Sequence, residues 1–175
     1  VLERLARLLR QASHGGGLIP VQWEALRYFA KANRLSKTPG ALAKYLASTK
    51  GTVSQTVGAL EAKGLVVKQP RPGNERFVNI SLTPQAAELL SADPLAALLS
   101  DITALSTKTQ RRLGRGLDAL LNAEAARQTQ PRFGTCAQCR FFREGGVAEE
   151  DRCMKDNFAI DELEMQRLCV EFTLR

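Results

Sequence analysis

The chain has 175 residues, of which 44% are hydrophobic, enough apolar material for one folded domain with an appendage. No apolar run approaches the ~20 residues that span a bilayer, and the charged N-terminal stretch lacks the apolar core of a secretion signal, so we expect a cytoplasmic protein without membrane contact. The net charge of +7 is uneven: residues 1–131 hold 18 Lys and Arg against 9 Asp and Glu, and residues 132–175 hold 7 against 9. A basic body with a slightly acidic tail favours a polyanionic partner for the body alone.

The first part of the chain predicts two amphipathic helices. Leucines at helical spacing form one apolar stripe across residues 1–12, at Leu2, Leu5, Leu8 and Leu9. A second helix is predicted over residues 20–32, because the proline at its start suits the first helical turn. Its Trp23 and Phe29 are more typical of a core than of a functional site, and His14, between the helices, is expected to be solvated.

A helix-turn-helix pattern comes next. Thr38 is expected to cap a short helix that Pro39 opens. After a tight connection, Thr49 caps a second helix over residues 50–63, which Gly64 ends. The apolar face of this second helix recurs at i, i+4 and i+7 and consists of Val53, Val57 and Leu60. Small and polar residues occupy the opposite face, so its backbone can approach a partner closely.

A β-hairpin is predicted after the second of these helices. Residues 65–69 and 77–82 read as two strands, and the turn-rich loop between them carries Arg71 and Arg76. Two short helices with such a hairpin behind them are the plan of a winged helix-turn-helix, a fold that binds duplex DNA.

The helical pattern returns beyond the hairpin. A helix is predicted from Thr83 towards residue 99, and the pair Asp93–Pro94 is expected to bend or break it, because proline removes a donor and clashes with the preceding turn. Ser106 caps a last long helix through residue 127.

Two stretches of this region resemble the multiple antibiotic resistance regulator (MarR) family. The run ALAKYLASTKGTVSQTVGALEAKGLV matches, without gaps, the scaffold helix, recognition helix and first wing strand of that family, and VNISLTPQA resembles its second wing strand and the start of the next helix. The resemblance covers residues 18–125 and implies a mainly α fold with a small β-hairpin wing and a helical dimerisation region. Two positions depart from the family: Asn74 stands where an Asp usually precedes the wing arginine, and Ala86 where a Gly is usual.

The DNA-binding prediction assigns residues by position. The N-terminal part of a recognition helix reaches base edges in the major groove, and here it contains Thr49, Lys50, Thr52 and Gln55. Gln55 can pair with an adenine edge, Thr52 can contact a thymine methyl or a phosphate, and Lys50 supplies charge. The wing residues Arg71 and Arg76 are predicted to enter the flanking minor groove, which attracts arginine where it is narrow. A winged helix that binds protein instead is the alternative.

The terminal helices suggest a homodimer. Their leucine stripes would leave exposed apolar faces on a monomer, and in the resembled family such helices interlock around a two-fold axis. A two-fold dimer predicts an operator that is an inverted repeat of duplex DNA. Packing of these faces within one chain remains the alternative.

The tail holds the four cysteines of the chain. We place the boundary near residue 130: residues 1–130 form the winged helix and dimerisation region, with its core at about 18–90, and residues 131–175 form the extension. The cysteines have the spacing Cys136-x2-Cys139-x13-Cys153-x15-Cys169. Clustered cytosolic cysteines are more often metal or redox groups than disulfides, and a segment this short is expected to need a metal staple to fold.

An iron–sulfur cluster, 4Fe–4S or 2Fe–2S, is the favoured centre, and Zn²⁺ is the alternative. Only one CxxC knuckle is present and aromatic residues flank the cysteines, whereas zinc sites usually offer two knuckles. The ligand order, with CAQCRFF first and CVEF last, is similar to that of high-potential iron–sulfur proteins, although their glycines and Trp near the later ligands are absent. Redox thiols without metal are a third reading.

These features together predict a transcriptional repressor whose DNA affinity responds to redox, oxygen or iron status through the cluster. The suggested route is the adjacency of the tail to the dimerisation helix, which would alter the separation of the recognition helices. The alternative is a MarR-like regulator with a structural zinc tail and a small-molecule effector. We expect no enzyme, because the sequence has no Gly-rich nucleotide loop, no Ser/His/Asp set and no carboxylate pair in a plausible pocket.

Overall fold

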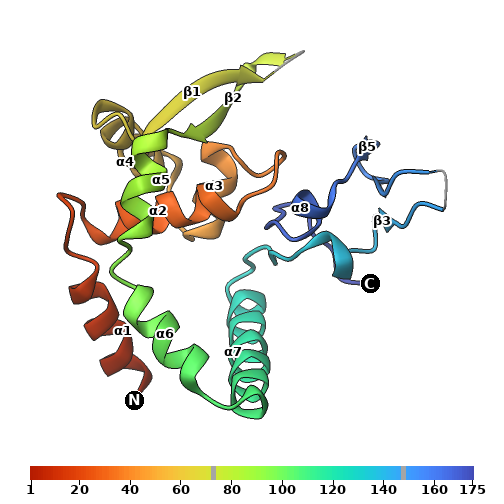
Figure 1. Ribbon diagram of the computed structural model, residues 1–175. Helices are drawn as coiled ribbons and strands as arrows, with labels where there is room; N and C mark the ends of the chain where they lie inside the picture. Colours follow the sequence, from red (N-terminus) through yellow and green to blue (C-terminus); the bar gives the residue numbers. More distant parts are fainter. Residues whose placement is uncertain (72–73, 147–148) are drawn as a thin grey trace.

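The computed structural model describes residues 1–71, 74–146 and 149–175, and the side chains of residue 71 and residues 74–77 also lie outside the described part. The described chain is mainly helical (Figure 1), with helices α1 (Leu2–Ala12), α2 (Pro20–Lys31), α3 (Pro39–Tyr45), α4 (Lys50–Ala62), α5 (Pro84–Ser91), α6 (Ala96–Ala104), α7 (Thr107–Arg127), η1 (Cys136–Gln138) and α8 (Glu162–Met165). Its strands are β1 (Val66–Arg71), β2 (Asn74–Leu82), β3 (Phe142–Arg143), β4 (Arg152–Cys153) and β5 (Phe158–Ala159). No helix in these residues is long and apolar enough to cross a membrane.

The hydrophobic core lies between α2, α3, α4 and the root of the wing. The fully buried side chains at its centre come from each of these elements: Trp23, Leu26, Phe29, Leu42, Val53, Val57, Leu60, Val66 and Ile80. Trp23 and Phe29 are each 1% exposed, which confirms them as core residues. Because the apolar faces of α3 and α4 are buried here, the polar face of α4 turns outward.

The predicted helix ends are confirmed. The hydroxyls of Thr38, Thr49 and Ser106 accept bonds from backbone amides three residues later, at 3.1, 3.1 and 3.3 Å. Gly64 ends α4 with a φ of +69°, a conformation that glycine adopts without strain. The break at Asp93–Pro94 separates α5 from α6.

The wing is longer than predicted. Its antiparallel strands β1 and β2 pair from Val66 with Leu82 out to Arg71 with Asn74, with an irregularity between Pro70 and Arg71. The residues at the outer end are turn formers, so their composition suggested a loop. Cross-strand pairing overrides such weak local preferences.

The remaining helices extend away from the core. α1, α6 and α7 contain no buried residue, and their large exposed side chains are Leu2, Leu5, Leu8, Leu99, Leu113, Leu117, Leu120 and Leu121. After α7 the chain returns towards the winged helix, and the tail lies beside α3 (Figure 1). There β3, β4 and β5 form a small antiparallel sheet.

Candidate nucleic-acid interface and cysteine site

The N-terminal turns of α4 present a polar surface. Thr49, Lys50, Thr52 and Gln55 are exposed, whereas Val53 on the other side of the helix is 1% exposed. The two threonine hydroxyls are 2.9 Å apart and share a hydrogen bond, so the cap of the helix also orients the side chain of Thr52. The surface is therefore built by the same capping and burial that form the helix.

The wing arginines cannot be placed in the same way. Arg71 ends β1 and Arg76 lies in β2, but both side chains lie outside the described residues. Their predicted contact with the minor groove stays a prediction.

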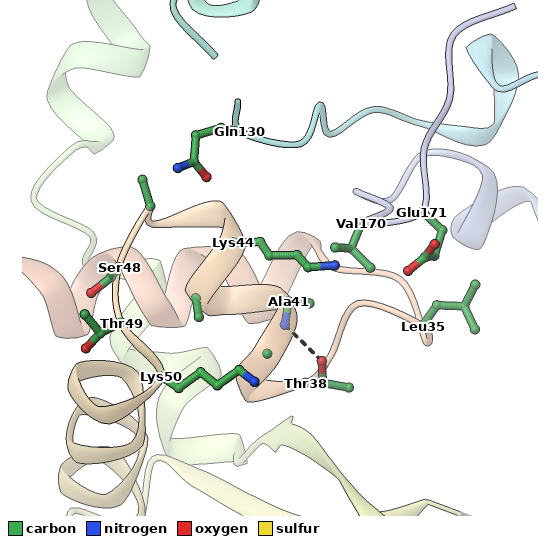
Figure 2. Close-up of a pocket in the computed structure, with 13 residues that line it drawn as sticks. Leu35, Thr38, Ala41, Lys44, Ser48, Thr49, Lys50, Gln130, Val170 and Glu171 are labelled. Atoms are coloured by element: carbon green, nitrogen blue, oxygen red, sulfur yellow. Dashed lines mark hydrogen bonds between the residues drawn. The ribbon is translucent and has the colours of Figure 1, made fainter. Parts of the chain in front are cut away.

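An open pocket of about 860 Å³ adjoins the start of α4. It is lined by α3, the connection to α4 and the tail residues Val170 and Glu171. Figure 2 shows the side chain of Lys44 extending from α3 towards Val170, and that of Lys50 extending towards Thr38. Sequence reasoning missed this juxtaposition, because nothing in the spacing of the tail indicates that it lies beside the helix-turn-helix.

The four cysteines line one cavity. Cys136, Cys139 and Cys169 are each 7% exposed and Cys153 is half-buried. All four are free thiols. The rest of the lining is mostly apolar and comes from both the tail and the α2–α3 turn, defined here as residues 32–37: Asn33, Leu35, Phe141, Phe142, Lys155, Phe158, Ile160 and Glu171.

The thiols influence one another. Burial raises the pKa of Cys136 to about 11, and the neighbouring Cys169, Cys153 and Cys139 add to the rise. Burial also raises the pKa of Cys169, while the side chain of Asn33 acts against that rise. Within the described residues, no three Cys, His, Asp or Glu side chains are arranged as a group that could hold a metal ion. The structure brings the predicted ligands to one cavity, and their binding of a metal stays a prediction.

Backbone pairing holds the cysteine segments together. The amide of Cys139 donates to the carbonyl of Cys136 at 2.9 Å, and the amide of Cys169 donates to the carbonyl of Gly134 at 2.9 Å. A Cβ at Gly134 would lie 2.7 Å from the ring of Phe172, so only glycine fits there without a shift of the ring. The segment that carries the last cysteine is thus bonded directly to the segment that leads into the first.

The last cysteine segment also pairs with the winged-helix part of the chain. The amide of Leu168 donates to the carbonyl of Lys31 at 2.8 Å, and its carbonyl accepts from the amide of Asn33 at 2.9 Å. The amide of Val170 donates to the hydroxyl of Ser36 at 2.8 Å. Sequence reasoning missed these contacts, because partners more than 130 residues apart leave no local pattern.

Comparison with known proteins is consistent with this geometry. Residues 16–76 match the model of the MarR family. The MarR-like segment therefore contains α2, α3, α4 and most of the wing. No curated protein sequence matches the chain.

Solved structures share the fold beyond that segment. The MepR–DNA complex of S. aureus superposes with a TM-score of 0.56 at 21% identity and covers 70% of this chain and 94% of that one. A MarR transcriptional regulator from Methanosarcina mazei Go1 superposes with a TM-score of 0.57 at 17% identity, and the match covers 71% of this chain and 91% of that one. A probable transcriptional regulator from Pseudomonas aeruginosa superposes with a TM-score of 0.51 at 27% identity, and the match covers 69% of this chain and 92% of that one. The mainly helical MarR-like fold with a small antiparallel wing is confirmed.

Proposed function

We propose that the protein is a transcriptional repressor that binds duplex DNA as a homodimer and adjusts its DNA affinity through an iron–sulfur cluster. The observation that supports DNA binding is the exposed polar start of α4, set on a buried apolar face in a MarR-like fold. One solved structure with this fold is that of MepR from S. aureus in complex with DNA. The excess of nine positive charges on residues 1–131 matches a polyanion.

On DNA, α4 would lie in the major groove with its N-terminus towards the base edges. Gln55 would pair with a base edge, and Thr52 and Lys50 would contact bases or phosphates. Lys44, which lines the pocket beside α4, would contact a neighbouring phosphate. These positions follow from the exposed side chains of the helix-turn-helix.

Dimerisation would cover the apolar faces of α1, α6 and α7. Leu120 and Leu121 are 58% and 69% exposed in one chain, an unfavourable state for leucines in water. Packing within the chain, the alternative that the sequence left open, does not bury them. A two-fold dimer of these helices would present two α4 helices to an inverted-repeat operator.

The lining of the cysteine cavity supports the proposal of a cluster. The four thiols line one cavity with an aromatic wall of Phe141, Phe142 and Phe158, which limits the access of water. Cys136, Cys139, Cys153 and Cys169 would hold the cluster, and the cluster would supply a one-electron redox change. Zn²⁺ on the same thiols remains the alternative centre.

The test begins with anaerobic purification of the full chain. Iron and acid-labile sulfide in the protein, with absorbance near ~400 nm, would support a cluster, whereas stoichiometric zinc in a colourless protein would overturn it in favour of the alternative. Selection from a random duplex library then identifies the operator. Enrichment of an inverted repeat is expected, and failure to enrich any sequence would contradict the DNA-binding proposal.

The regulatory part is tested with the selected operator. Fluorescence anisotropy compares the cluster-loaded protein, the cluster-free protein and the Cys153→Ser variant, chosen because Cys153 is the least buried ligand. A coupling free energy of about 1–3 kcal/mol, or roughly 5–150-fold in affinity, is expected between the loaded and cluster-free forms. Equal affinities would remove the sensory role.

A further inference from the structure

In the side chain of Asn33, the oxygen atom has hydrogen-bond partners in the described part of the chain and the nitrogen atom has none. The residue is 0% exposed, and its Oδ1 accepts from the amide of Ser36 at 3.0 Å and from the Ser36 hydroxyl at 2.7 Å. Because a backbone amide can only donate, these bonds fix which end of the side chain is oxygen. The Nδ2 amide has no hydrogen-bond partner among the described residues. A buried donor without a partner destabilises the folded state, so the group requires an explanation.

The cysteine cavity supplies that explanation. Asn33 lines it together with all four cysteines, although it belongs to the α2–α3 turn and not to the tail. Its backbone amide donates at 2.9 Å to the carbonyl of Leu168, the residue directly before Cys169. A sulfur bound to a metal accepts N–H hydrogen bonds, and such bonds are one of the means by which a protein sets the properties of a cluster.

The turn is also bonded to the residues on either side of Cys169. Leu168 pairs with the backbone of Lys31 and Asn33, and the amide of Val170 donates to the hydroxyl of Ser36. That hydroxyl is the same one that donates to Asn33. The backbone of Cys169 is therefore held over the turn from both directions.

On its other side the turn contacts the DNA-binding elements. The carbonyl of Lys37 accepts from the amide of Ile80 in β2 at 2.7 Å, which joins the turn to the wing. Thr38, the next residue, is the N-cap of α3. The carbonyl of Ser36 accepts from the buried hydroxyl of Tyr28 in α2 at 2.8 Å. A displacement of the turn would act on the wing and on α3 together.

We propose that the α2–α3 turn connects the cysteine centre to the DNA-binding elements. We further propose that Asn33 is a positioning residue whose Nδ2, without a partner in the residues that the structure describes, donates to the sulfur of Cys169 once the centre is bound. The inference rests on the proposed function, since it requires a metal centre on the cysteines. It replaces the route through the dimerisation helix, which adjacency in the sequence suggested. Binding or loss of the centre shifts Cys169, and the turn passes that shift to β2 and α3.

The role of Asn33 is tested by the midpoint potential of the cluster. Asn33→Ser replaces the amide with a shorter hydroxyl, which can remain bonded to Ser36 and no longer reaches as far as Nδ2, while Asn33→Asp keeps Oδ1 and replaces the amide N–H groups with an acceptor. Asn79→Ser is the matched control, because Asn79 also has an unpartnered buried atom but lies on β2 outside the cavity. Both Asn33 variants are expected to shift the potential downward at unchanged iron content, since an N–H bond to sulfur favours the reduced cluster. A potential equal to that of the wild type in both would overturn the assignment.

The route is tested by hydrogen–deuterium exchange of the whole chain in its loaded and cluster-free forms. Loading is expected to slow exchange in residues 32–37 and at the amide of Ile80, and to leave residues 107–127 of α7 unchanged. A change confined to α7 would overturn the route. If the purified protein binds neither iron nor zinc, the proposed cofactor fails and this inference fails with it. If the protein binds a cluster, but loading does not change exchange in the turn and the Asn33 variants do not change the midpoint potential, this inference fails and the proposed function stands.

Discussion

At the scale of single residues, the start of α4 combines a structural role with the DNA-binding role that we propose. Thr49 caps the helix and bonds the hydroxyl of Thr52, and Lys50 and Gln55 extend into solvent from the first and second turns. None of these exposed side chains is needed for the core. Substitutions at Lys50 and Gln55 are expected to change DNA binding with little effect on folding, since surface changes usually stay within about 0.5 kcal/mol.

Lys50→Ala is expected to weaken operator binding and to lower its salt dependence. Loss of one phosphate contact should reduce the slope of log affinity against log salt by about one per subunit. The measurement is anisotropy over a salt series. Lys108→Ala is the control, because Lys108 is also an exposed lysine but lies at the start of α7. A slope that is the same for Lys50→Ala and the wild type would contradict the contact.

At the scale of elements, one ion pair fixes the break between α5 and α6 against α2. The guanidinium of Arg27 donates to both carboxylate oxygens of Asp93 at 2.7 Å, and each side chain is 16% exposed. Asp93 also accepts from the amide of Leu95 at 2.8 Å. Burial alone would raise the pKa of Asp93, but these donors outweigh it and hold the pKa below its usual range. The pair therefore joins the break between α5 and α6 to α2.

Asp93→Asn is expected to lower the free energy of unfolding by about 1.5–3 kcal/mol at pH 7, the range for hydrogen bonds to charged groups. Because the folded pKa is depressed, this stability is present above the unfolded value of about 4 and is lost as pH falls through the folded pKa. Denaturant unfolding between pH 7 and pH 3 should therefore show the gap between wild type and variant closing. Asp101→Asn, at an exposed site on α6, should show no such gap.

At the scale of the whole molecule, α7 has an exposed apolar surface, which we propose is covered by a second copy of the chain. Leu113, Leu117, Leu120 and Leu121 recur at helical spacing and are all exposed. The pattern occupies one face of the helix, so a single partner helix surface can cover it. DNA binding by two subunits would then depend on this face although it does not touch DNA.

Leu117→Asp is expected to convert the dimer to a monomer, because it places a charge in the face that the partner covers. Operator affinity should fall with it, since only one half-site is then bound at a time. Sedimentation velocity measures the first effect and anisotropy the second. Ala119→Asp is the control, because Ala119 lies two residues further along and so on the opposite face of α7. Loss of the dimer in both variants, or in neither, would contradict this interface.

Local structure could be predicted from the order of the amino acids alone. Thr38, Thr49 and Ser106 cap helices, and Val53 and Val57 form a buried face, because capping and amphipathic spacing act over a few residues. The MarR-like order of helices and wing arises from the same short-range patterns. The outer end of the wing was underestimated, since pairing across the hairpin outweighed the turn preference of its residues.

The position of the tail and its contacts emerged only from the folded chain. The spacing of the cysteines suggested one centre, but it gave no sign that Cys169 would be held over the α2–α3 turn or that Asn33 would line the cavity. Contacts such as that between Val170 and Ser36 join residues far apart in the chain. They depend on how complete surfaces fit together, whereas helix caps and strand patterns depend on neighbours along the chain.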